Sequence, residues 1–463
     1  MERKNAWAAY AGDDGKVEAF AKAYCDFINN GKTERECVAY GEKLAKAHGF
    51  EDLNAVVRSG RKLNAGARVY VNWMGKSFML FVLGEKPLEE GMNILGAHID
   101  SPRIDVKQNP LYEDTDLAYL DTHYYGGIKK YQWVAIPLAL HGVIVRKTGE
   151  KVIINIGEDE NDPVFCISDL LVHLAQEQMT KNAKEVVEGE ALNLIVGGRP
   201  LEGEEKDAVK ANVLKLLADK YGVEEEDFLS AELEIVPAGK ARDMGFDRSM
   251  ILAYGHDDRV CAYPSMMAVL DYEGTPEYTL CCIVTDKEEI GSVGATGMAS
   301  HYLENTVAEL YACTADYCEL AVRRCLRNSR MLSSDVSAGY DPNFASAFEK
   351  KNSAFLGRGI CFNKFTGSRG KSGSNDANPE FMASLRKIMD DAGVAFQTAE
   401  LGRVDLGGGG TIAYLCAKYG MNVIDSGIPV LSMHAPYEVV SKVDLYEGYR
   451  GYCAFLRGAK PVE

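Results

Sequence analysis

The feature that most constrains this chain is a set of apolar, strand-like runs that each end in histidine or carboxylate residues. The run MNILGA leads into His98 and Asp100, and YTLCCIVT leads into the acidic pair Glu288 and Glu289. A third run, NVIDSGIPVLSM, ends at His434. Open α/β sheets bind their ligands at the carboxyl ends of the strands. The pattern therefore predicts an α/β sheet with a site along one edge.

The alternation of helical and strand-like segments is interrupted in the middle of the chain. Apolar spacing predicts helices over 15–50, and residues 67–83 alternate as strands do. Strand-like runs and an acidic helical segment at 202–227 fill the middle, where the His and carboxylate clusters are absent. We expect a three-layer α/β/α domain with a mostly parallel sheet, made of 1–105 and 245–463, and a smaller β-rich insertion at 106–244.

Composition narrows the classes of function. The formal net charge of −17 over 463 residues argues against a nucleic-acid partner, which needs a basic surface. No run of 18 apolar residues predicts a membrane span, and the N-terminus lacks the apolar core of a signal peptide. The twelve cysteines include no CxxC pair, so we expect reduced thiols and a cytoplasmic protein.

Further carboxylates occur in the same strand-end setting. Asp257 and Asp258 lie in HDDR, and Asp335 lies in SSDVS. Carboxylates are rarely buried unless they are paired or bind a metal. Together with the two histidines, they predict a cluster for divalent metal ions, for which zinc, cobalt and manganese are all suitable. The alternative interpretation is structural histidines beside solvated acidic turns; the deeply apolar strand before Glu288 favours the metal cluster.

Two of these residues have a predicted role beyond that of a ligand. Asp100 is two residues from His98, and a ligating histidine usually donates its second ring N–H to a carboxylate or carbonyl oxygen. In the Glu288–Glu289 pair, one carboxylate can bind metal while the other removes a proton from the attacking water. The chain has neither HExxH nor GxSxG, which excludes a zincin and a nucleophile elbow.

The ordered motifs GAHIDSPR, HDDR, DKEEIGS, SSDVS and SMHAP resemble the M18 family of metallo-aminopeptidases, which includes the aspartyl aminopeptidases. The resemblance covers nearly the whole chain, including YYGGI and ISDLLVHL in the insertion. It implies two divalent ions per subunit, zinc in the first place, with cobalt or manganese as alternatives. It also implies the ligand set: His98 and Asp335 for one ion, Glu289 and His434 for the other, and Asp258 as the bridge.

The resemblance implies roles for the remaining residues as well. Glu288 is expected to be the general base and Asp100 to orient His98, while Asp257 matches no ligand. A cis peptide bond is expected between Asp258 and Arg259. His173 matches a histidine that reaches into the active site of a neighbouring subunit.

The implied activity is removal of the N-terminal residue from peptides. The implied assembly is a homo-oligomer, a tetrahedral dodecamer built from dimers, with residues 106–244 as the dimerisation and lid domain. The chain departs from the aspartyl members at one position that concerns specificity. The lysine that binds the acidic side chain of the substrate in those members aligns with about Cys361 here. The preferred N-terminal residue, acidic or neutral, therefore stays open.

Two other functions remain as alternatives. The first keeps the metals but changes the bond, as in a carboxypeptidase or amidase of the same clan. The second is a non-catalytic oligomeric scaffold. The presence of Glu288 beside the predicted ligands argues against the scaffold, because a protein without activity does not need a base at that position.

Overall fold

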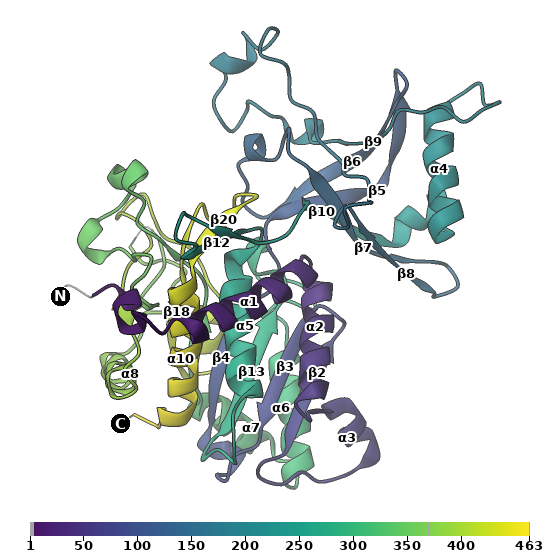
Figure 1. The fold of residues 1–463 in the computed structure, drawn as a ribbon. Helices are drawn as coiled ribbons and strands as arrows, with labels where there is room; N and C mark the ends of the chain where they lie inside the picture. Colours follow the sequence, from purple (N-terminus) through teal and green to yellow (C-terminus); the bar gives the residue numbers. More distant parts are fainter. Residues whose placement is uncertain (1–3, 369, 463) are drawn as a thin grey trace. The chain divides into compact units, whose positions relative to one another are not determined.

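The computed structural model describes residues 4–368 and 370–462, and the chain folds as two compact units (Figure 1). The first unit contains the chain up to Asp100, residues Ala241–Met433, and the chain from Glu438 onward. The second contains Ser101–Lys240 and the short segment His434–Tyr437. The chain thus enters the second unit close to where the insertion was expected to begin, and it returns there for four residues near the C-terminus.

A nine-stranded sheet forms the centre of the first unit. Its strands, in spatial order, are β1 (Glu51–Asp52), β2 (Arg68–Trp73), β3 (Ser77–Val82), β13 (Thr279–Thr285), β4 (Met92–His98), β14 (Arg330–Ser334), β18 (Asn422–Gly427), β16 (Ile360–Asn363) and β17 (Phe396–Thr398). The central strands β13, β4, β14 and β18 run parallel to one another. Their carboxyl ends therefore lie along the same edge of the sheet.

The sheet is apolar on both faces. Successive side chains of a strand point to opposite sides, so a strand made only of apolar residues contributes to both faces. Along β13, Leu280, Cys282 and Val284 pack into one hydrophobic core, and Cys281 and Ile283 pack into the other. This explains why the strand is a continuous apolar run in the sequence rather than an alternating one, as is usual for sheets covered on both faces.

Helices cover both faces of the sheet. The helices that contribute to the first core are α1 (Gly15–Asn30), α2 (Glu34–Ala47), α5 (His256–Leu270), α8 (Pro379–Asp391) and α10 (Lys442–Gly458). Those that contribute to the second are α3 (Leu53–Ser59), α6 (Tyr302–Thr314), α7 (Glu319–Asn328) and α9 (Ala413–Ala417). The predicted three-layer α/β/α architecture is confirmed.

The local sequence explains why the N-terminal helices divide where they do. The Thr33 hydroxyl accepts the Glu36 N–H, and the Glu36 side chain accepts the Thr33 N–H. This reciprocal arrangement satisfies amides that a helix start leaves without partners. The helical prediction for 15–50 therefore corresponds to two helices, with α2 beginning after Thr33.

A small sheet in the first unit joins segments that are distant in the sequence. Its strands, in spatial order, are β11 (Arg242–Met244), β12 (Met250–Ala253), β20 (Glu438–Ser441), β19 (Pro429–Leu431) and β15 (Ser337–Ala338). It brings the segment before α5, the segment after β14 and the C-terminal strands together. Each of these segments is next in sequence to a predicted metal ligand.

The second unit is built on an antiparallel six-stranded sheet. Its strands, in spatial order, are β8 (Lys151–Ile156), β7 (Leu138–Val145), β10 (Ala231–Pro237), β5 (Arg103–Asp114), β6 (Leu117–Tyr125) and β9 (Leu194–Gly197). The acidic segment 202–227 contains α4 (Ala208–Tyr221), which ends at Gly222 with a left-handed φ of 61°, and the start of a 3-10 helix (Glu225–Ser230). The expected β-rich character of the insertion agrees with this sheet.

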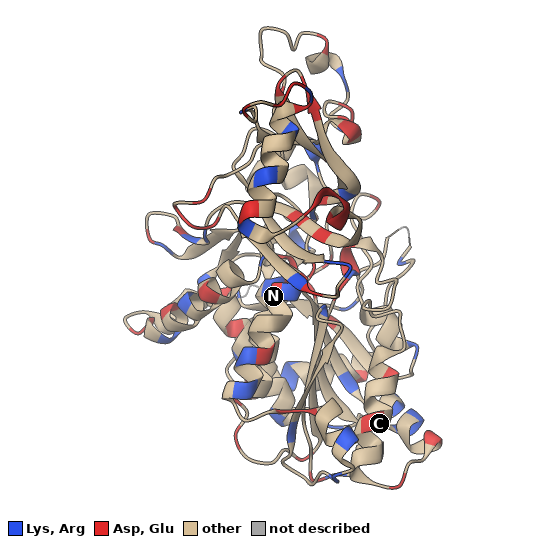
Figure 2. Cartoon of the chain, turned by 90° about the vertical axis from the view of Figure 1, so that its right-hand side faces the viewer, with Lys and Arg blue, Asp and Glu red and all other residues tan. Residues whose placement is uncertain are grey.

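The surface carries charges of both signs. Figure 2 shows acidic and basic residues interspersed along the helices of the ribbon. Among the described residues, no helix is both long enough and apolar enough to span a bilayer.

Candidate metal centre

The predicted site lies at the carboxyl edge of the nine-stranded sheet. His98 is the last residue of β4, the Glu288–Glu289 pair follows β13 in a short 3-10 turn (Glu288–Ile290), and Asp335 follows β14. Because β13 and β14 both pair in parallel with β4, these three strand ends are neighbours. The sheet topology alone therefore brings residues 98, 288 and 335 together.

Carboxylate oxygens converge on one imidazole nitrogen. The Nε2 atom of His98 lies 3.2 Å from Asp257 Oδ1, 3.8 Å from Asp335 Oδ1 and 3.9 Å from Glu288 Oε2. Ligand atoms of His98, Asp257 and Glu289 also lie within 4.8 Å of one another, as do those of His98, Glu288 and Asp335. The sequence-predicted residues 98, 288, 289 and 335 are thus gathered around a single point.

Asp100 connects His98 to the Glu288–Glu289 turn. Its backbone carbonyl oxygen lies 3.0 Å from His98 Nδ1, and its Oδ1 lies 3.3 Å from the same nitrogen. A carbonyl can only accept, so Nδ1 carries the proton and Nε2 is left to bind a metal. The Asp100 carboxylate also accepts the backbone N–H groups of Glu288 and Glu289, each at 3.1 Å.

The structure revises the sequence interpretation of the adjacent aspartates. Asp257, which was assigned no ligand role, points Oδ1 at His98 Nε2. Asp258 accepts the backbone N–H of His98 through Oδ2 at 3.3 Å. The cis peptide bond joins Asp257 to Asp258, so the expectation of a cis bond between Asp258 and Arg259 is wrong. Two neighbouring aspartates are equivalent in sequence, and only the backbone path after Gly255 decides which one faces the histidine.

Burial and like charge perturb the titration of this cluster. Burial is the largest cause that raises the pKa of Glu288; His98 opposes it, the carboxylates of Asp335, Asp100 and Asp257 add to it, and the net result is a pKa of about 8. Burial likewise raises the pKa of Asp258 well above its usual range. Burial lowers the pKa of His98, but its carboxylate partners outweigh this and raise it. All three shifts reflect an excess of buried negative charge that a cation would neutralise.

The donor set fits divalent metal ions. It consists of an imidazole nitrogen with a fixed tautomer and several carboxylate oxygens, which zinc and manganese both accept. One oxygen, Asp258 Oδ1, is buried without a hydrogen bond among the described residues. Buried polar atoms are normally satisfied, so the cluster has capacity for a positively charged ligand.

His434 belongs to the second unit in the division of the chain. It follows β19 with a left-handed φ of 65°, and its Nδ1 lies 2.8 Å from the carbonyl oxygen of Gly127. Because that carbonyl can only accept, Nδ1 carries the proton. The groups of potential ligands found in the described chain do not include His434.

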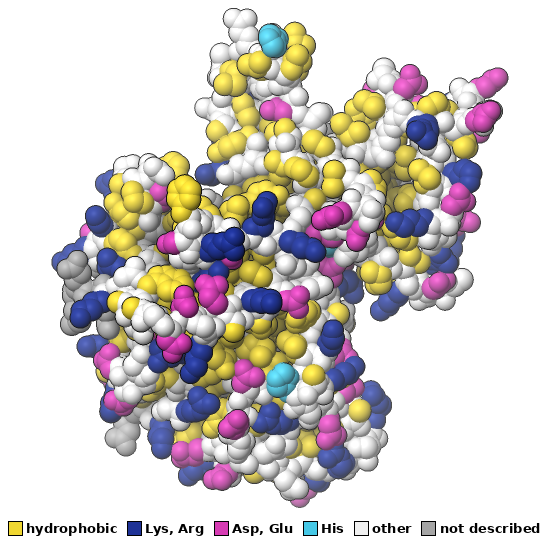
Figure 3. Space-filling model, viewed as in Figure 1, with side chains coloured by type: hydrophobic (Ala, Val, Ile, Leu, Met, Phe, Trp, Pro, Cys, Tyr) yellow, Lys and Arg dark blue, Asp and Glu magenta, His cyan; other side chains and the backbone are white. Residues whose placement is uncertain are grey.

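His173 lies on an exposed, irregular part of the second unit. Apolar side chains surround it in the sequence and are mostly exposed, including Leu171 at 53 %, Val172 at 78 % and Leu174 at 68 %. Figure 3 shows apolar side chains exposed on this part of the chain, at the top of the view. In its own chain His173 is therefore a surface residue, and His123 and His301 are also exposed.

Two residues that the sequence analysis did not single out position the aspartate pair. The Asp257 N–H donates to Glu438 Oε2 at 3.0 Å, and Arg259 Nε donates to the Ile99 carbonyl at 3.1 Å. Both side chains are almost fully buried. A glutamate inside the apolar strand EVVS and an arginine directly after two aspartates were the available sequence signals.

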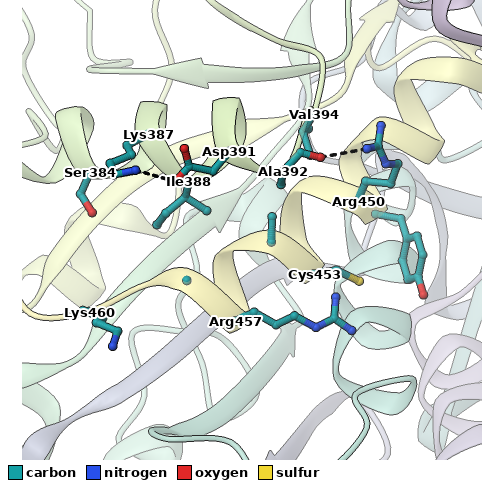
Figure 4. Close-up of a pocket in the computed structure, with 13 residues that line it drawn as sticks. Ser384, Lys387, Ile388, Asp391, Ala392, Val394, Arg450, Cys453, Arg457 and Lys460 are labelled. Carbon is teal, nitrogen blue, oxygen red and sulfur yellow. Dashed lines mark hydrogen bonds and ion pairs between the residues drawn. The ribbon is translucent and has the colours of Figure 1, made fainter.

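A hollow elsewhere in the first unit is lined in part by basic side chains and by none of the predicted metal ligands. It has a volume of about 710 Å³, lies between α8 and α10, and includes Lys387, Arg450 and Arg457 in its lining (Figure 4). Lys387 is paired with Asp391, and Arg450 donates to the Ala392 carbonyl. None of the predicted site residues lines this hollow, so it is separate from the metal centre.

A sheet edge that gathers histidine and carboxylates in this way defines a metal-dependent enzyme. Residues 27–456 match the family model described as aminopeptidase I zinc metalloprotease (M18). A probable M18 family aminopeptidase 1 from Clostridium acetobutylicum is 58% identical over 459 residues, which cover 98% of each chain.

Solved structures agree with this match. The crystal structure of an M18 family aminopeptidase from Thermotoga maritima has a TM-score of 0.94 and 43% identity, and the similarity covers 99% of this chain and 100% of that one. An S. cerevisiae mApe1 dodecamer shares the fold at a TM-score of 0.75 and 21% identity, over 94% and 95% of the two chains. The chain belongs to the M18 family of zinc metallo-aminopeptidases, as the ordered motifs predicted.

Proposed function

We propose that this chain removes the N-terminal residue of peptides with two divalent metal ions held at the sheet edge. The observation that carries the proposal is the convergence of three carboxylates on His98 Nε2. His98 and Asp335 would hold one ion, and Glu289 and His434 the other. Asp257 replaces Asp258 as the proposed bridge, because its Oδ1 is the carboxylate oxygen closest to His98 Nε2 among these contacts.

Glu288 is the proposed general base. Its carboxylate lies next to the cluster, is 15 % exposed, and has a pKa raised to about 8 by burial. A pair of ions bound here would polarise the scissile carbonyl and activate a water. Glu288 would take the proton of the attacking water and deliver it to the leaving amine. A carboxylate within reach of the attacking water can perform both transfers.

Asp258 and Asp100 have supporting roles in this proposal. Asp258 accepts the backbone N–H of His98 and so fixes the backbone of that residue. Asp100 accepts from the His98 ring and from the backbone amides of Glu288 and Glu289. Metal analysis of Asp257→Asn and Asp258→Asn would separate the two aspartates. We expect Asp257→Asn to lose bound metal and Asp258→Asn to retain it with weakened affinity; the reverse result would restore Asp258 as the bridge.

The proposed assembly is a homo-oligomer, with residues 106–244 serving in dimerisation and as a lid. Two observations support it: the exposed apolar segment around His173, and the dodecamer formed by the mApe1 relative of the same fold. In a tetrahedral dodecamer built from dimers, His173 of one subunit would complete the active site of a neighbour by donating to the reacting carbonyl.

The proposed place of action is the cytoplasm, and zinc is the first candidate for the native metal. All twelve cysteines are free thiols in the structure, although several are close to others in the core. Thiols persist in this number mainly in reducing compartments. The description of the family names zinc, and the nitrogen and oxygen donors also suit cobalt and manganese.

An activity profile tests the proposed function directly. The metal-loaded protein would be given a set of aminoacyl-p-nitroanilides and N-blocked dipeptides, each with zinc, cobalt or manganese. Hydrolysis of the free-amine substrates alone supports an aminopeptidase and also reveals whether acidic or neutral residues are preferred. Hydrolysis of the blocked dipeptides would favour the carboxypeptidase or amidase alternative. Inactivity with every metal would favour the scaffold alternative.

A further inference from the structure

A network of buried polar groups connects the Glu288–Glu289 turn to the β2–β3 hairpin. Asp286 follows β13 and is fully buried, two residues before Glu288. Its Oδ2 accepts the hydroxyl of Thr296 at 2.5 Å and lies 2.8 Å from Lys287 Nζ. Thr296 is ten residues further along the chain, so this hydrogen bond closes the loop that carries both glutamates.

The β2–β3 turn holds the same loop from a second side. The backbone N–H of Asp286 donates to Ser77 Oγ at 3.2 Å, and the Ser77 hydroxyl donates to the Thr296 carbonyl at 2.6 Å. Trp73 Nε1 donates to the Ala295 carbonyl at 2.9 Å. Both ends of the 286–296 loop are therefore bonded to residues of one hairpin.

Lysine charge balances the buried carboxylate of Asp286. Lys76, in the same hairpin turn, is 7 % exposed; its Nζ lies 2.8 Å from Glu34 Oε1 and 3.6 Å from Asp286 Oδ2. Burial raises the pKa of Asp286, and Lys76 opposes this shift. An ionised carboxylate in this position needs such partners, because an unpaired buried charge is strongly unfavourable.

The loop itself has little freedom between its two anchors. Lys287, Gly291 and Ser292 all have left-handed φ values, and the Ser292 N–H donates to the Lys287 carbonyl at 2.7 Å. The Asp100 carboxylate accepts the Glu288 and Glu289 amides, as described above. The network around Asp286 fixes the loop that carries the same turn to the β2–β3 hairpin.

We propose that Asp286, Thr296 and Ser77 are positioning residues for the general base, setting where the Glu288 carboxylate lies relative to the substrate. This inference rests on the proposed role of Glu288. The three residues lie behind the turn and act through the 286–296 loop rather than by touching substrate. Small displacements of a catalytic group reduce the rate strongly while substrate affinity is retained.

Isosteric variants test the proposal. Thr296→Val removes the hydroxyl that binds Asp286 and keeps the side-chain shape, and Ser77→Ala breaks the second connection. For both we expect kcat to fall about 10-fold to 100-fold, by analogy with small misplacements of catalytic groups, while KM and metal content stay at parental values. Thr296→Ser restores the hydroxyl and should restore most of kcat. Thr306→Val, which removes a buried hydroxyl on α6, is the matched control and should leave kcat unchanged.

Several outcomes would overturn the inference. Parental kcat in both Thr296→Val and Ser77→Ala, measured well below their melting temperatures, would show that the network serves stability alone. A loss of activity that follows a loss of metal would show that it acts through the metal ligands. If Thr296→Val does not fold, the kcat of Ser77→Ala alone tests the inference.

Measuring Glu288→Gln in parallel distinguishes failure of the positioning inference from failure of the proposed function. An active Glu288→Gln would overturn both the assigned base and this inference. An inactive Glu288→Gln beside fully active network variants would overturn the inference alone.

Discussion

The carboxyl edge of the nine-stranded sheet and the 164–179 segment of the second unit depart from the usual distribution of residues in opposite ways. At the sheet edge, carboxylates are buried: Asp257 and Asp258 are at most 2 % exposed. In the 164–179 segment, several large apolar side chains are exposed, from 45 % at Leu170 to 78 % at Val172, although Ile167 is buried. Each arrangement is energetically unfavourable in the absence of a partner.

The two regions differ in the kind of partner that physical chemistry allows. Buried carboxylates of like charge are stabilised by a small cation that binds several oxygens at once. An exposed apolar patch is stabilised by another apolar surface of comparable area. We propose metal ions at the sheet edge and a second copy of the chain against the exposed segment, and the predictions below test each proposal.

The largest expected effect is at the sheet edge. Glu288→Gln keeps the volume of the side chain but removes its ability to take a proton. We expect kcat to fall about 10²-fold to 10⁴-fold, the usual loss for a general base, with both the fold and the metal content unchanged. Steady-state kinetics on aminoacyl substrates and elemental analysis measure the two quantities. A variant with the parental rate would remove Glu288 from the mechanism.

The next effect tests whether the exposed segment also serves catalysis. His173→Ala should lower kcat/KM by about 10²-fold to 10³-fold, as loss of one donor to a reacting oxygen does, while metal content stays constant. His301→Ala is the control, because this exposed histidine lies in the first unit. Equal activities of the two variants would restrict His173 to a surface role.

A charge placed in the exposed segment should change the assembly. Leu171→Asp puts a carboxylate where the proposal requires an apolar contact, so we expect light scattering to show smaller species than the parent. Leu320→Asp on α7 is a matched control, since Leu320 is also exposed, at 52 %, and lies in the first unit. An unchanged mass for Leu171→Asp would contradict the assignment of a second copy to this surface.

Metal removal should have the smallest of these effects, on stability. Chelation leaves the buried carboxylates without a counter-charge, so the melting temperature should fall and recover when zinc is added back. A ligand at 100 times its Kd stabilises the folded state by about 2.7 kcal/mol, which sets the expected scale. The melting temperature by calorimetry, with and without chelator, provides the measurement. No change on chelation would mean that the sheet edge is stable without a cation.

Several parts of the fold and the site could be predicted from the sequence. The apolar runs before His98 and Glu288 identified strands whose carboxyl ends carry polar residues, and sheet topology then placed these residues together. The choice between Asp257 and Asp258 could not be predicted, because it depends on the backbone path after Gly255. The contribution of Glu438 was also missed: its carboxylate reaches the Asp257 amide from a strand 181 residues away.

The sequence by itself determined the α/β class and the family, because strand periodicity and ordered motifs are local properties of a chain. It also predicted the residue types of the candidate metal centre. Only the tertiary structure decided which aspartate faces His98 and which buried groups fix the Glu288–Glu289 turn. Those outcomes depend on contacts between residues far apart in sequence, such as Ser77 with Thr296, and on side-chain directions that residue spacing does not specify.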